Sequence, residues 1–593
     1  MAVNDVMLLT SSEEGSVDSR LAELLRFLGV PCQLLGCTDF FAAASASGNG
    51  QNSGVVLAAD TLRKFLQAAS RSRQEVVEFL GSFESVLIYG LTPSSLSRED
   101  LNFISGGSVR DYSELPSSGQ LTVSGGHRAL CGPLSGLEFT SSTVRFGLKT
   151  APGFDGQTFI RSAADSILLR MPNGRASMFL TTAADIVNLN EQLVSNFDAR
   201  STFDRLVPYV LFARAAFPGM CWKPRRQHAC LIIDDPLLRP RYGFLNVVEL
   251  LQWLDQSRVA ANLAFIPWNR NRSSRVVADM IRRSDRFALC VHGCDHTRGE
   301  FGSADSAWLD TLAQLAVERM DQHYLKSGVG YQNVMVFPQG VFSHEAMGIL
   351  KHRDFVAAVN TEVVPRHHSS EQGRISLRSL LDMASMDYHD LALFSRRGCH
   401  NDIADYALDL FMGKPAFFVA HHDYFRDGLG NLKTLAANLH GLMPELTWAT
   451  VGNVVDMSYL CRSISTDTTS VRMFGNALRL ENEGNDPMIF DVRKQERNRS
   501  SVGGVFVDEK PIDFDWEQNH VRFSCAVPPG QSLKVVVRYR KPSARQCSVP
   551  GFKYRARTAA RRYLSEIRDS YVQPLQRLLS GSHAAGSRQR LLE

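Results

Sequence analysis

The sequence lacks the features that define several large protein classes. No apolar run approaches the roughly 20 residues that a membrane-spanning helix needs. The 11 cysteines are scattered without CxxC pairs, which argues against both a disulfide scaffold and a structural zinc module. The formal net charge of +4 is small for 593 residues, so composition gives no case for nucleic-acid binding.

Targeting signals are also missing from the beginning of the sequence. Met1 to Thr10 contain no basic segment followed by a long apolar stretch and a small-residue cleavage site. We therefore expect a cytoplasmic protein with reduced thiols. Peripheral association with a membrane stays open as an alternative.

A chain of this length is expected to form two to four domains. Strands alternate with helices over residues 1–220, including one long helix predicted from Leu62 to Phe79, which predicts a doubly wound, mostly parallel α/β domain. The region resembles flavodoxin-like or glutamine-amidotransferase-like domains. It has no GxGxxG, no P-loop and no nucleophile turn, since Cys131 lies in Ala-Leu-Cys-Gly-Pro. A non-catalytic accessory domain is favoured over a degenerate amidotransferase.

Residues 225–460 repeat the strand–helix pattern and carry the residues with chemical potential. The apolar run Leu231-Ile232-Ile233 ends in Asp234-Asp235-Pro236, and the run from Phe287 to Val291 ends in His292 and, four residues later, His296. Buried parallel strands deliver polar side chains to their carboxyl ends in this way. One Asp and two His suit a divalent metal with open coordination positions, and the second carboxylate is left to act as a base.

These residues resemble the NodB-like polysaccharide deacetylases (carbohydrate esterase family 4). The resemblance implies a distorted (β/α) barrel, Asp234 as the general base, and Asp235, His292 and His296 as metal ligands. It also implies one divalent ion, with zinc favoured and cobalt, nickel or iron as alternatives. Asp234 must turn into the site beside its neighbour, and Pro236 is consistent with a sharp turn there.

The sequence departs from the family pattern at several positions. No glycine separates Asp235 from Pro236, and Gly293 stands where the family has Ser or Thr. The Arg-x-Pro-Tyr motif has a partial echo in Phe337-Pro338-Gln339, without its Arg and Tyr. The family's Asp-plus-Trp motif is not found.

The resemblance implies a catalytic acid after the strand Pro415–Ala420. His422, which precedes Asp423, matches the family's acid, and His421 is its rival because the doublet is ambiguous. Phe337, Pro338, Gln339 and Tyr424 are the candidates for substrate contact.

The last two regions carry no activity signature. Short strands separated by turns over residues 465–545 predict a small β-sandwich. Residues 550–593 form a basic helical tail with a possible apolar face that includes Tyr554, Tyr563 and Tyr571. This helix either docks on a neighbouring domain or meets an anionic partner or a membrane surface.

The sequence thus predicts a metal-dependent hydrolase that removes acetyl groups, N-acetyl above all, from an oligo- or polysaccharide. Its expected partner is an acetylated glycan, with no nucleic acid. The alternatives are a non-catalytic glycan-binding or scaffold protein on a decayed deacetylase barrel, and a metal hydrolase of another C–N bond.

Overall fold

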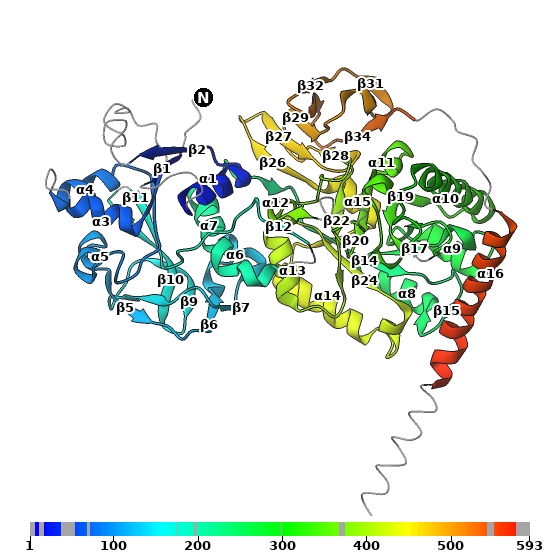
Figure 1. Cartoon of the computed structure of the whole chain (residues 1–593), viewed down its shortest axis with the longest axis horizontal. Coiled ribbons are helices and arrows are strands. Elements are labelled where there is room, and N and C mark those ends of the chain that lie inside the picture. Colours follow the sequence, from blue (N-terminus) through cyan, green and yellow to red (C-terminus); the bar gives the residue numbers. More distant parts are fainter. Residues whose placement is uncertain are drawn as a thin grey trace, which may run out of the picture.

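The computed structural model describes residues 6–10, 17–36, 54–67, 72–174, 176–194, 198–297, 299–366, 374–541 and 551–576. The chain forms an N-terminal α/β part, a central barrel-like part, a β-rich part beside the barrel, and a C-terminal helix (Figure 1). Within the described ranges, every helix is too short or too polar to cross a membrane.

The N-terminal part is built on one mixed sheet with the main strand order β2-β1-β3-β4-β11-β10-β9-β6-β7. Strands β1 to β4 pair in parallel and β11 joins β4 in parallel, whereas the strands beyond β11 pair antiparallel, so the sheet is less parallel than predicted for residues 1–220. The strands are β1 Val6–Thr10, β2 Cys32–Gly36, β3 Gly54–Ala58, β4 Ser85–Tyr89, β5 Val109–Glu114, β6 Gly119–Val123, β7 Glu138–Ser141, β8 Phe146–Thr150, β9 Gln157–Ser162, β10 Asp165–Asn173 and β11 Ala176–Thr181.

Helices pack on both faces of this sheet and enclose two apolar cores. They are α1 Val17–Leu28, α3 Ala59–Gln67, α4 Arg73–Leu80, α5 Arg98–Ile104, α6 Arg128–Cys131 and α7 Phe203–Ala216. The prediction of one helix from Leu62 to Phe79 is wrong. A new helix begins after Ser72, whose hydroxyl accepts from the Glu75 N–H while the Glu75 carboxylate accepts from the Ser72 N–H, a capping box that fixes a helix start.

The central part contains a parallel sheet that nearly closes on itself, with the order β22-β20-β19-β18-β17-β14-β24-β23 and β25 beside β14. The strands are β14 His228–Asp234, β17 Ala261–Phe265, β18 Phe287–His292, β19 Tyr331–Val336, β20 Ala357–Asn360, β22 Leu393–Ser395, β23 Arg397–Gly398, β24 Ala416–Ala420 and β25 Thr447–Trp448. Side chains alternate along β14: Cys230 and Ile232 pack in the inner core, and Leu231 and Ile233 pack under the surrounding helices.

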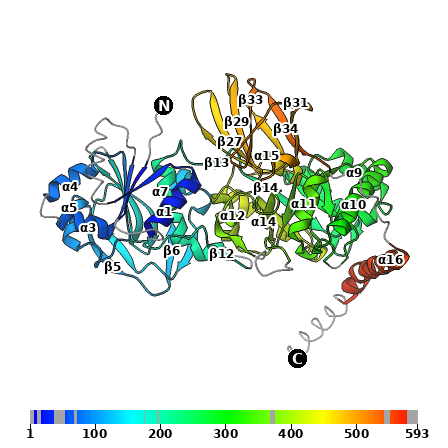
Figure 2. The ribbon, with the colours of Figure 1, turned by 45° about the horizontal axis from the view of Figure 1, so that its top comes forward.

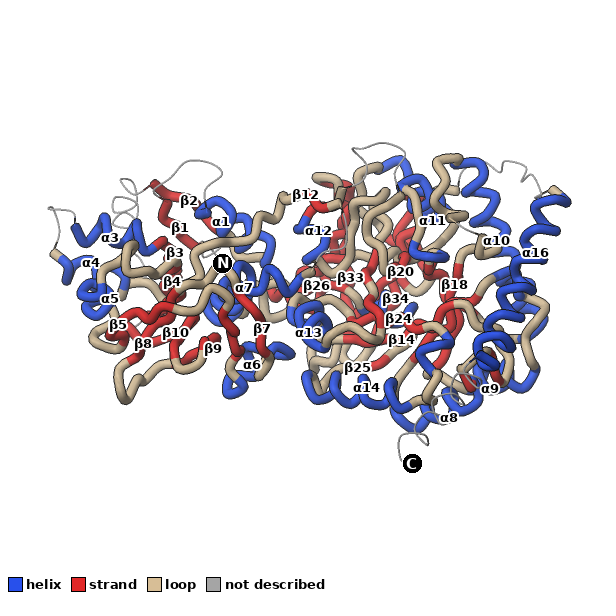
Figure 3. Tube along the Cα trace, turned by 60° about the horizontal axis from the view of Figure 1, so that its bottom comes forward, coloured by secondary structure: helices blue, strands red, loops and turns tan. Residues whose placement is uncertain are grey.

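Helices surround this barrel-like sheet on its outer side (Figure 3). They are α8 Val247–Ser257, α9 Arg275–Arg283, α10 Ser306–Ser327, α11 His344–His352, α12 Leu377–Leu381, α13 Ile403–Phe411 and α14 Gly430–Leu442. The short helix α15, Val451–Met457, instead contributes Val451, Val454 and Val455 to the inner core. The predicted strand–helix repeat is therefore present. Strand β22 and helices α12, α13 and α15 were not predicted, because they are short or lack a clear apolar period.

The β-rich part consists of two sheets that share one apolar core (Figure 2). One sheet has the order β13-β26-β27-β29-β33-β32 and the other β28-β34-β30-β31. The strands are β13 Lys223–Pro224, β26 Tyr459–Ser463, β27 Thr468–Met473, β28 Ala477–Glu481, β29 Met488–Gln495, β30 Val502–Val507, β31 Lys510–Ile512, β32 Asp515–Glu517, β33 His520–Val527 and β34 Ser532–Tyr539. The first sheet takes in β26, which lies before the predicted start of the sandwich at residue 465.

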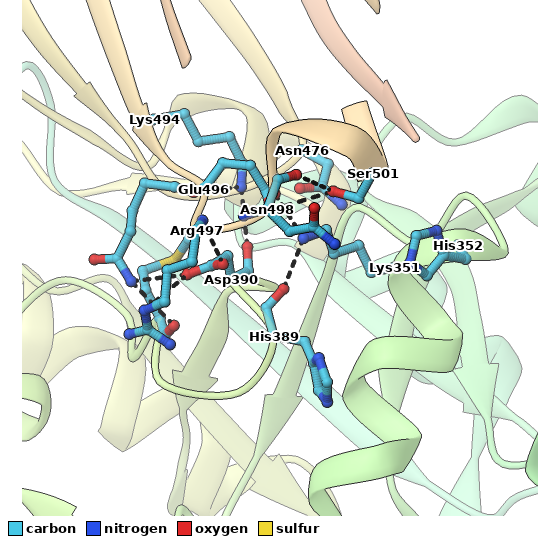
Figure 4. Close-up of polar contacts among 12 residues, drawn as sticks. Lys351, His352, His389, Asp390, Asn476, Lys494, Glu496, Arg497, Asn498 and Ser501 are labelled. Atoms are coloured by element: carbon cyan, nitrogen blue, oxygen red, sulfur yellow. Dashed lines mark hydrogen bonds and ion pairs between the residues drawn. The ribbon is translucent and has the colours of Figure 1, made fainter. Parts of the chain in front are cut away.

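A buried network of charges joins the β-rich part to the barrel (Figure 4). The Lys351 ammonium lies 2.6 Å from a Glu496 carboxylate oxygen and donates to the His389 carbonyl, and Lys494 donates to the Asp390 carbonyl. Burial, together with the charge of Lys351, lowers the pKa of Lys494 to about 8. Because buried charges are costly without partners, this network fixes how the two parts meet.

Candidate metal centre

Two adjacent carboxylates reach the same site because the backbone turns sharply between them. Asp234 is the last residue of β14 and its side chain follows Ile232 toward the inside of the barrel. Asp235 has a φ of 74°, which breaks the extended alternation. Asp tolerates this left-handed region better than most residues. The predicted turn is therefore present, and Asp235 itself makes it.

His292 and His296 lie beside Asp235, at the end of the strand two places along the sheet. The Asp235 Oδ1 atom is 3.0 Å from His292 Nε2 and 2.8 Å from His296 Nε2. His292 Nδ1 donates to the Val336 carbonyl at 2.9 Å, which leaves its Nε2 free to face Asp235. Such a backbone contact is the usual way of orienting a ligating imidazole.

The loop between the two histidines requires a glycine at its first position. Gly293 has a φ of 61°, and a Cβ atom built there would lie 2.1 Å from Glu300 Oε1 and 2.4 Å from a ring carbon of Pro338. The departure from the family's Ser or Thr therefore has a local steric reason. A side chain at this position would collide with the groups that hold the loop.

Glu300 holds this loop from inside. Its buried carboxylate accepts hydrogen bonds from the backbone N–H groups of Cys294 at 2.7 Å and of Asp295 at 3.1 Å, and also from His296 and Thr297. One carboxylate thus satisfies four backbone donors and sets the direction of the His296 side chain. Glu300 was not predicted, since an isolated Glu four positions after a histidine has no distinctive pattern.

The donor set fits a divalent ion. The ligand atoms of Asp235, His292 and His296 all lie within 4.8 Å of one another. Asp235 Oδ1 is buried and has no hydrogen-bond partner among the described residues. Two nitrogens and a carboxylate oxygen suit zinc, and three protein ligands leave positions for water and substrate.

Arg396 is a functional residue that the sequence analysis missed. Its guanidinium donates to both oxygens of Asp234, at 2.8 and 2.6 Å, and both side chains are buried. Burial alone would raise the pKa of Asp234, but the charges of Arg396, His292 and His421 outweigh it and keep that pKa below its ordinary value. Asp234 is therefore ionised at neutral pH and able to accept a proton.

The two neighbouring histidines after β24 occupy different environments. Ile233 of β14 pairs with Ala420 of β24 and the backbone stays extended through His421, so His421 follows Asp234 on the inner side of the sheet. His421 is exposed, and its charge lowers the pKa of Asp234. His422 is buried, stacks on Phe244, and has its Nε2 atom 3.7 Å from Asp569 Oδ1.

Three of the four predicted substrate contacts lie in the packed interior. Phe337 is fully buried between Phe301 and Phe342, so its prediction as a substrate contact is corrected. Pro338 is buried against Gly293. Tyr424 is also buried, with its ring edge-on to that of His400.

Gln339 differs from these three. It is exposed, and it has a φ of 58°. Phe337 and Pro338 fill space beneath the loops, whereas Tyr424, although largely buried, lines a cavity beside His400.

The C-terminal helix α16, Phe552–Ile567, packs over the loops that carry this site (Figure 1). Thr558, Arg562 and Asp569 are buried on the face toward the barrel. Burial lowers the pKa of Arg562, and the nearby negative charge of Asp235 opposes this effect. The charge of a predicted metal ligand thus acts on a buried arginine of this helix.

Polar contacts fasten this helix to the loops. Glu566 forms ion pairs with Arg239, at 2.7 Å, and with Arg272. The Tyr242 hydroxyl donates to Asp569 at 3.1 Å. The docked alternative predicted for the tail is thus the one observed. On the predicted apolar face, Tyr554 packs against Trp308 and Tyr563 against Trp268, whereas Tyr571 is exposed.

Comparisons with known proteins give only distant likenesses. No family model matches the chain, and no curated protein matches it. The solved structures that are similar include a family 4 carbohydrate esterase from Streptomyces lividans, with 12% identity over 38% of this chain and 92% of that one and a TM-score of 0.23. A CE4 esterase from Streptococcus mutans has 13% identity over 38% of this chain and 87% of that one, with a TM-score of 0.23.

Another similar structure is a Thermoplasma acidophilum protein that is named provisionally as a component of GMP synthase. It has 13% identity over 37% of this chain and 97% of that one, with a TM-score of 0.24. All three TM-scores are too low to carry an argument about fold or activity. The amidotransferase-like prediction for the N-terminal part consequently gains no support, and the argument about function rests on the geometry of the site.

Proposed function

We propose that the chain is a metal-dependent hydrolase that removes acetyl groups, N-acetyl above all, from an oligo- or polysaccharide. One observation carries the proposal: Asp235 Oδ1 lies 3.0 and 2.8 Å from the Nε2 atoms of His292 and His296, next to a second carboxylate held by Arg396. A divalent ion and a carboxylate base are the combination that metal-assisted hydrolysis of an amide uses.

The chain's own residues have separable roles in the proposed reaction. Asp235, His292 and His296 would hold a divalent ion, which when bound acidifies water and polarises the acetyl carbonyl. Asp234 accepts the proton of the attacking water, and Arg396 orients this carboxylate and keeps it ionised. A protonated group must then supply a proton to the leaving amine.

We assign that acid role to His421 in place of His422. His421 shares the inner side of the sheet with Asp234 and is exposed, whereas His422 is enclosed by Tyr242, Phe244 and Asp569. An acid must reach the leaving nitrogen, and an enclosed ring cannot do so while α16 stays in place.

The test is metal analysis of the purified protein beside a His292→Ala, His296→Ala double variant, with acetate release from N-acetylglucosamine oligomers. Stoichiometric metal and acetate release in the wild type, both absent from the double variant, are the expected results. A His367→Ala, His368→Ala variant, at two positions outside the described residues, is the control for the loss of two histidines.

Other outcomes separate the alternatives. If the protein holds metal but releases no acetate from any acetylated glycan, the metal site is supported and the substrate contains another C–N bond. Absence of metal from the wild type, after incubation with zinc, would overturn the proposal in favour of a barrel used for binding.

A further inference from the structure

A cavity separate from the metal centre lies where the N-terminal part, the barrel and the β-rich part meet. Its volume is about 490 Å³. Arg26 and Phe27 of α1 line it from the N-terminal part, Arg378 of α12 from the barrel, and Arg472 and Arg493 from the β-rich part.

The β-rich wall of this cavity contains a row of arginines. Arg472 of β27 pairs in register with Arg493 of β29, which in turn pairs with Arg522 of β33. Residues in register point to the same face of a sheet, so three guanidinium groups lie next to one another. Like charges directly opposite each other destabilise a sheet, so this row carries an energetic cost.

Trp222 packs against part of this row, in which Arg472 also pairs with Asp382 and Arg522 with Glu517, so Arg493 is the member without a carboxylate partner among the described residues. The guanidinium carbons of Arg462, Arg472 and Arg493 lie 4.6, 5.8 and 4.9 Å from the ring centroid of Trp222. Burial and the neighbouring arginines lower the pKa of Arg493 to about 10, although Asp491 opposes this shift. The Nε atom of Arg493 is buried and has no hydrogen-bond partner among the described residues.

The carboxylates of the cavity are already engaged. Asp382 pairs with Arg472 at 2.6 Å, and Asp387 lies 3.9 Å from Arg497, which also reaches Asp390 (Figure 4). Within the described ranges, Arg26, Arg378 and Arg493 form no ion pair. Three guanidinium groups from three parts of the chain thus face one cavity without a counter-charge.

We propose that this cavity binds a small phosphorylated molecule through Arg26, Arg378 and Arg493. Guanidinium groups match the oxygens of a phosphate in bidentate geometry, and three uncompensated positive charges call for a multiply charged anion. Phe27 and Trp222 also line the cavity, where Phe27 packs against Arg378 and Trp222 packs against Arg472 and Arg493. Because the three arginines come from three parts of the chain, the bound ligand fastens these parts together.

The experiment is calorimetric titration of the full chain with inorganic pyrophosphate at fixed ionic strength. The wild type is expected to bind, and Arg493→Gln and Arg378→Gln are each expected to weaken binding about tenfold or more, as loss of a charge-assisted contact implies. Arg538→Gln is the matched control: it removes an arginine from the other sheet of the β-rich part, where Arg538 pairs with Glu509, and should leave affinity unchanged.

A second measurement separates loss of the site from loss of the fold. Without ligand and at low salt, Arg493→Gln should unfold at the same temperature as the wild type or higher, since it relieves repulsion within the row. Failure of pyrophosphate to bind the wild type, or equal binding by wild type and Arg493→Gln, would overturn the proposal. Citrate binding as tightly as pyrophosphate would overturn the assignment to phosphate.

Discussion

Arg396 and Asp234 form a buried bidentate ion pair, with Nη1–Oδ1 and Nη2–Oδ2 distances of 2.8 and 2.6 Å, although 162 positions separate them in the sequence. The arginine side chain enters the barrel near its seam, between β22 and β23. This contact holds the carboxylate of the proposed base in one direction and, together with His292 and His421, keeps its pKa low.

The Arg396→Lys substitution tests this relationship. A lysine keeps the charge but cannot hold both carboxylate oxygens, so we expect kcat to fall about tenfold to a hundredfold with metal content unchanged. Because lysine offsets the effect of burial less well than Arg396 does, the pKa of Asp234 should rise. The acidic limb of the pH profile of kcat/KM should therefore move to higher pH.

Arg397→Lys provides the control for this change. Arg397 is the adjacent residue and also pairs with a carboxylate, Asp409, at 2.5 and 3.1 Å, away from the metal centre. An equal loss of kcat in both variants would show that Arg396 acts only on the general packing of the barrel.

The two neighbouring histidines should respond differently to substitution. His421→Gln is expected to lower kcat about a hundredfold or more, as removal of a general acid does, with KM little changed. His422→Gln should leave most of kcat intact, and it should loosen α16 because it disrupts the contact with Asp569. The reverse pattern in steady-state kinetics would return the acid role to His422.

Gly293→Ala should damage the metal centre through the backbone. The left-handed φ and the collision with Glu300 and Pro338 together should destabilise the fold by about 1–3 kcal/mol. The His296 loop would shift, so zinc affinity measured with a competing chelator should also fall. Gly441→Ala in α14, where a Cβ meets nothing within 4 Å, is the control and should stabilise by about 0.5–1 kcal/mol.

Because α16 packs over the site, we expect this helix to limit the access of long substrates. Glu566→Lys replaces two ion pairs with repulsion from Arg239 and Arg272, so the helix should detach more often. We expect faster proteolysis after residue 541 and a larger rise in acetate release from polymers than from a single N-acetylglucosamine. Glu483→Lys, which breaks contacts of Arg225 and Arg226 at a distance from the helix, should change neither.

Acid should destabilise the fold through buried histidines. Burial lowers the pKa of His228 and of His323 to about 4, so both stay neutral in the folded protein at pH values where the unfolded chain takes up protons. The unfolded state therefore binds more protons between the unfolded pKa, ~6.5, and about 4, and the free energy of unfolding falls as pH drops through this range.

Urea denaturation at several pH values measures this effect. His323→Gln should make the free energy of unfolding depend less steeply on pH between about 6.5 and 4, because it removes one of the groups that take up a proton on unfolding. An unchanged slope would mean that His323 is already protonated in the fold.

The proximity of Asp235, His292 and His296 was predictable because its signal is local. Asp235 and His292 each come at the end of an apolar run that had to be a buried strand, His296 lies four residues after His292, and strand ends of a parallel sheet meet at one edge. The strand–helix alternation of the first two regions and the turn-separated strands of the third were predictable for the same reason, since period and turn chemistry are properties of neighbouring residues.

Contacts between residues far apart in the sequence were determined only by the tertiary structure. Arg396 lies outside any apolar repeat, and its pairing with Asp234 depends on how the barrel seam is built. The choice between His421 and His422 depends on strand register, which turns each side chain inward or outward.

The position of α16 over the site and the alignment of the arginine row likewise follow only from the tertiary structure. Arg562 is placed where the charge of Asp235 affects its pKa, and Arg472, Arg493 and Arg522 line up, only after separate segments have packed. A sequence determines which groups a segment can present, because local geometry sets their spacing. Packing between distant segments decides which of those groups share a dielectric environment, and hence which charges and pKa values the site has.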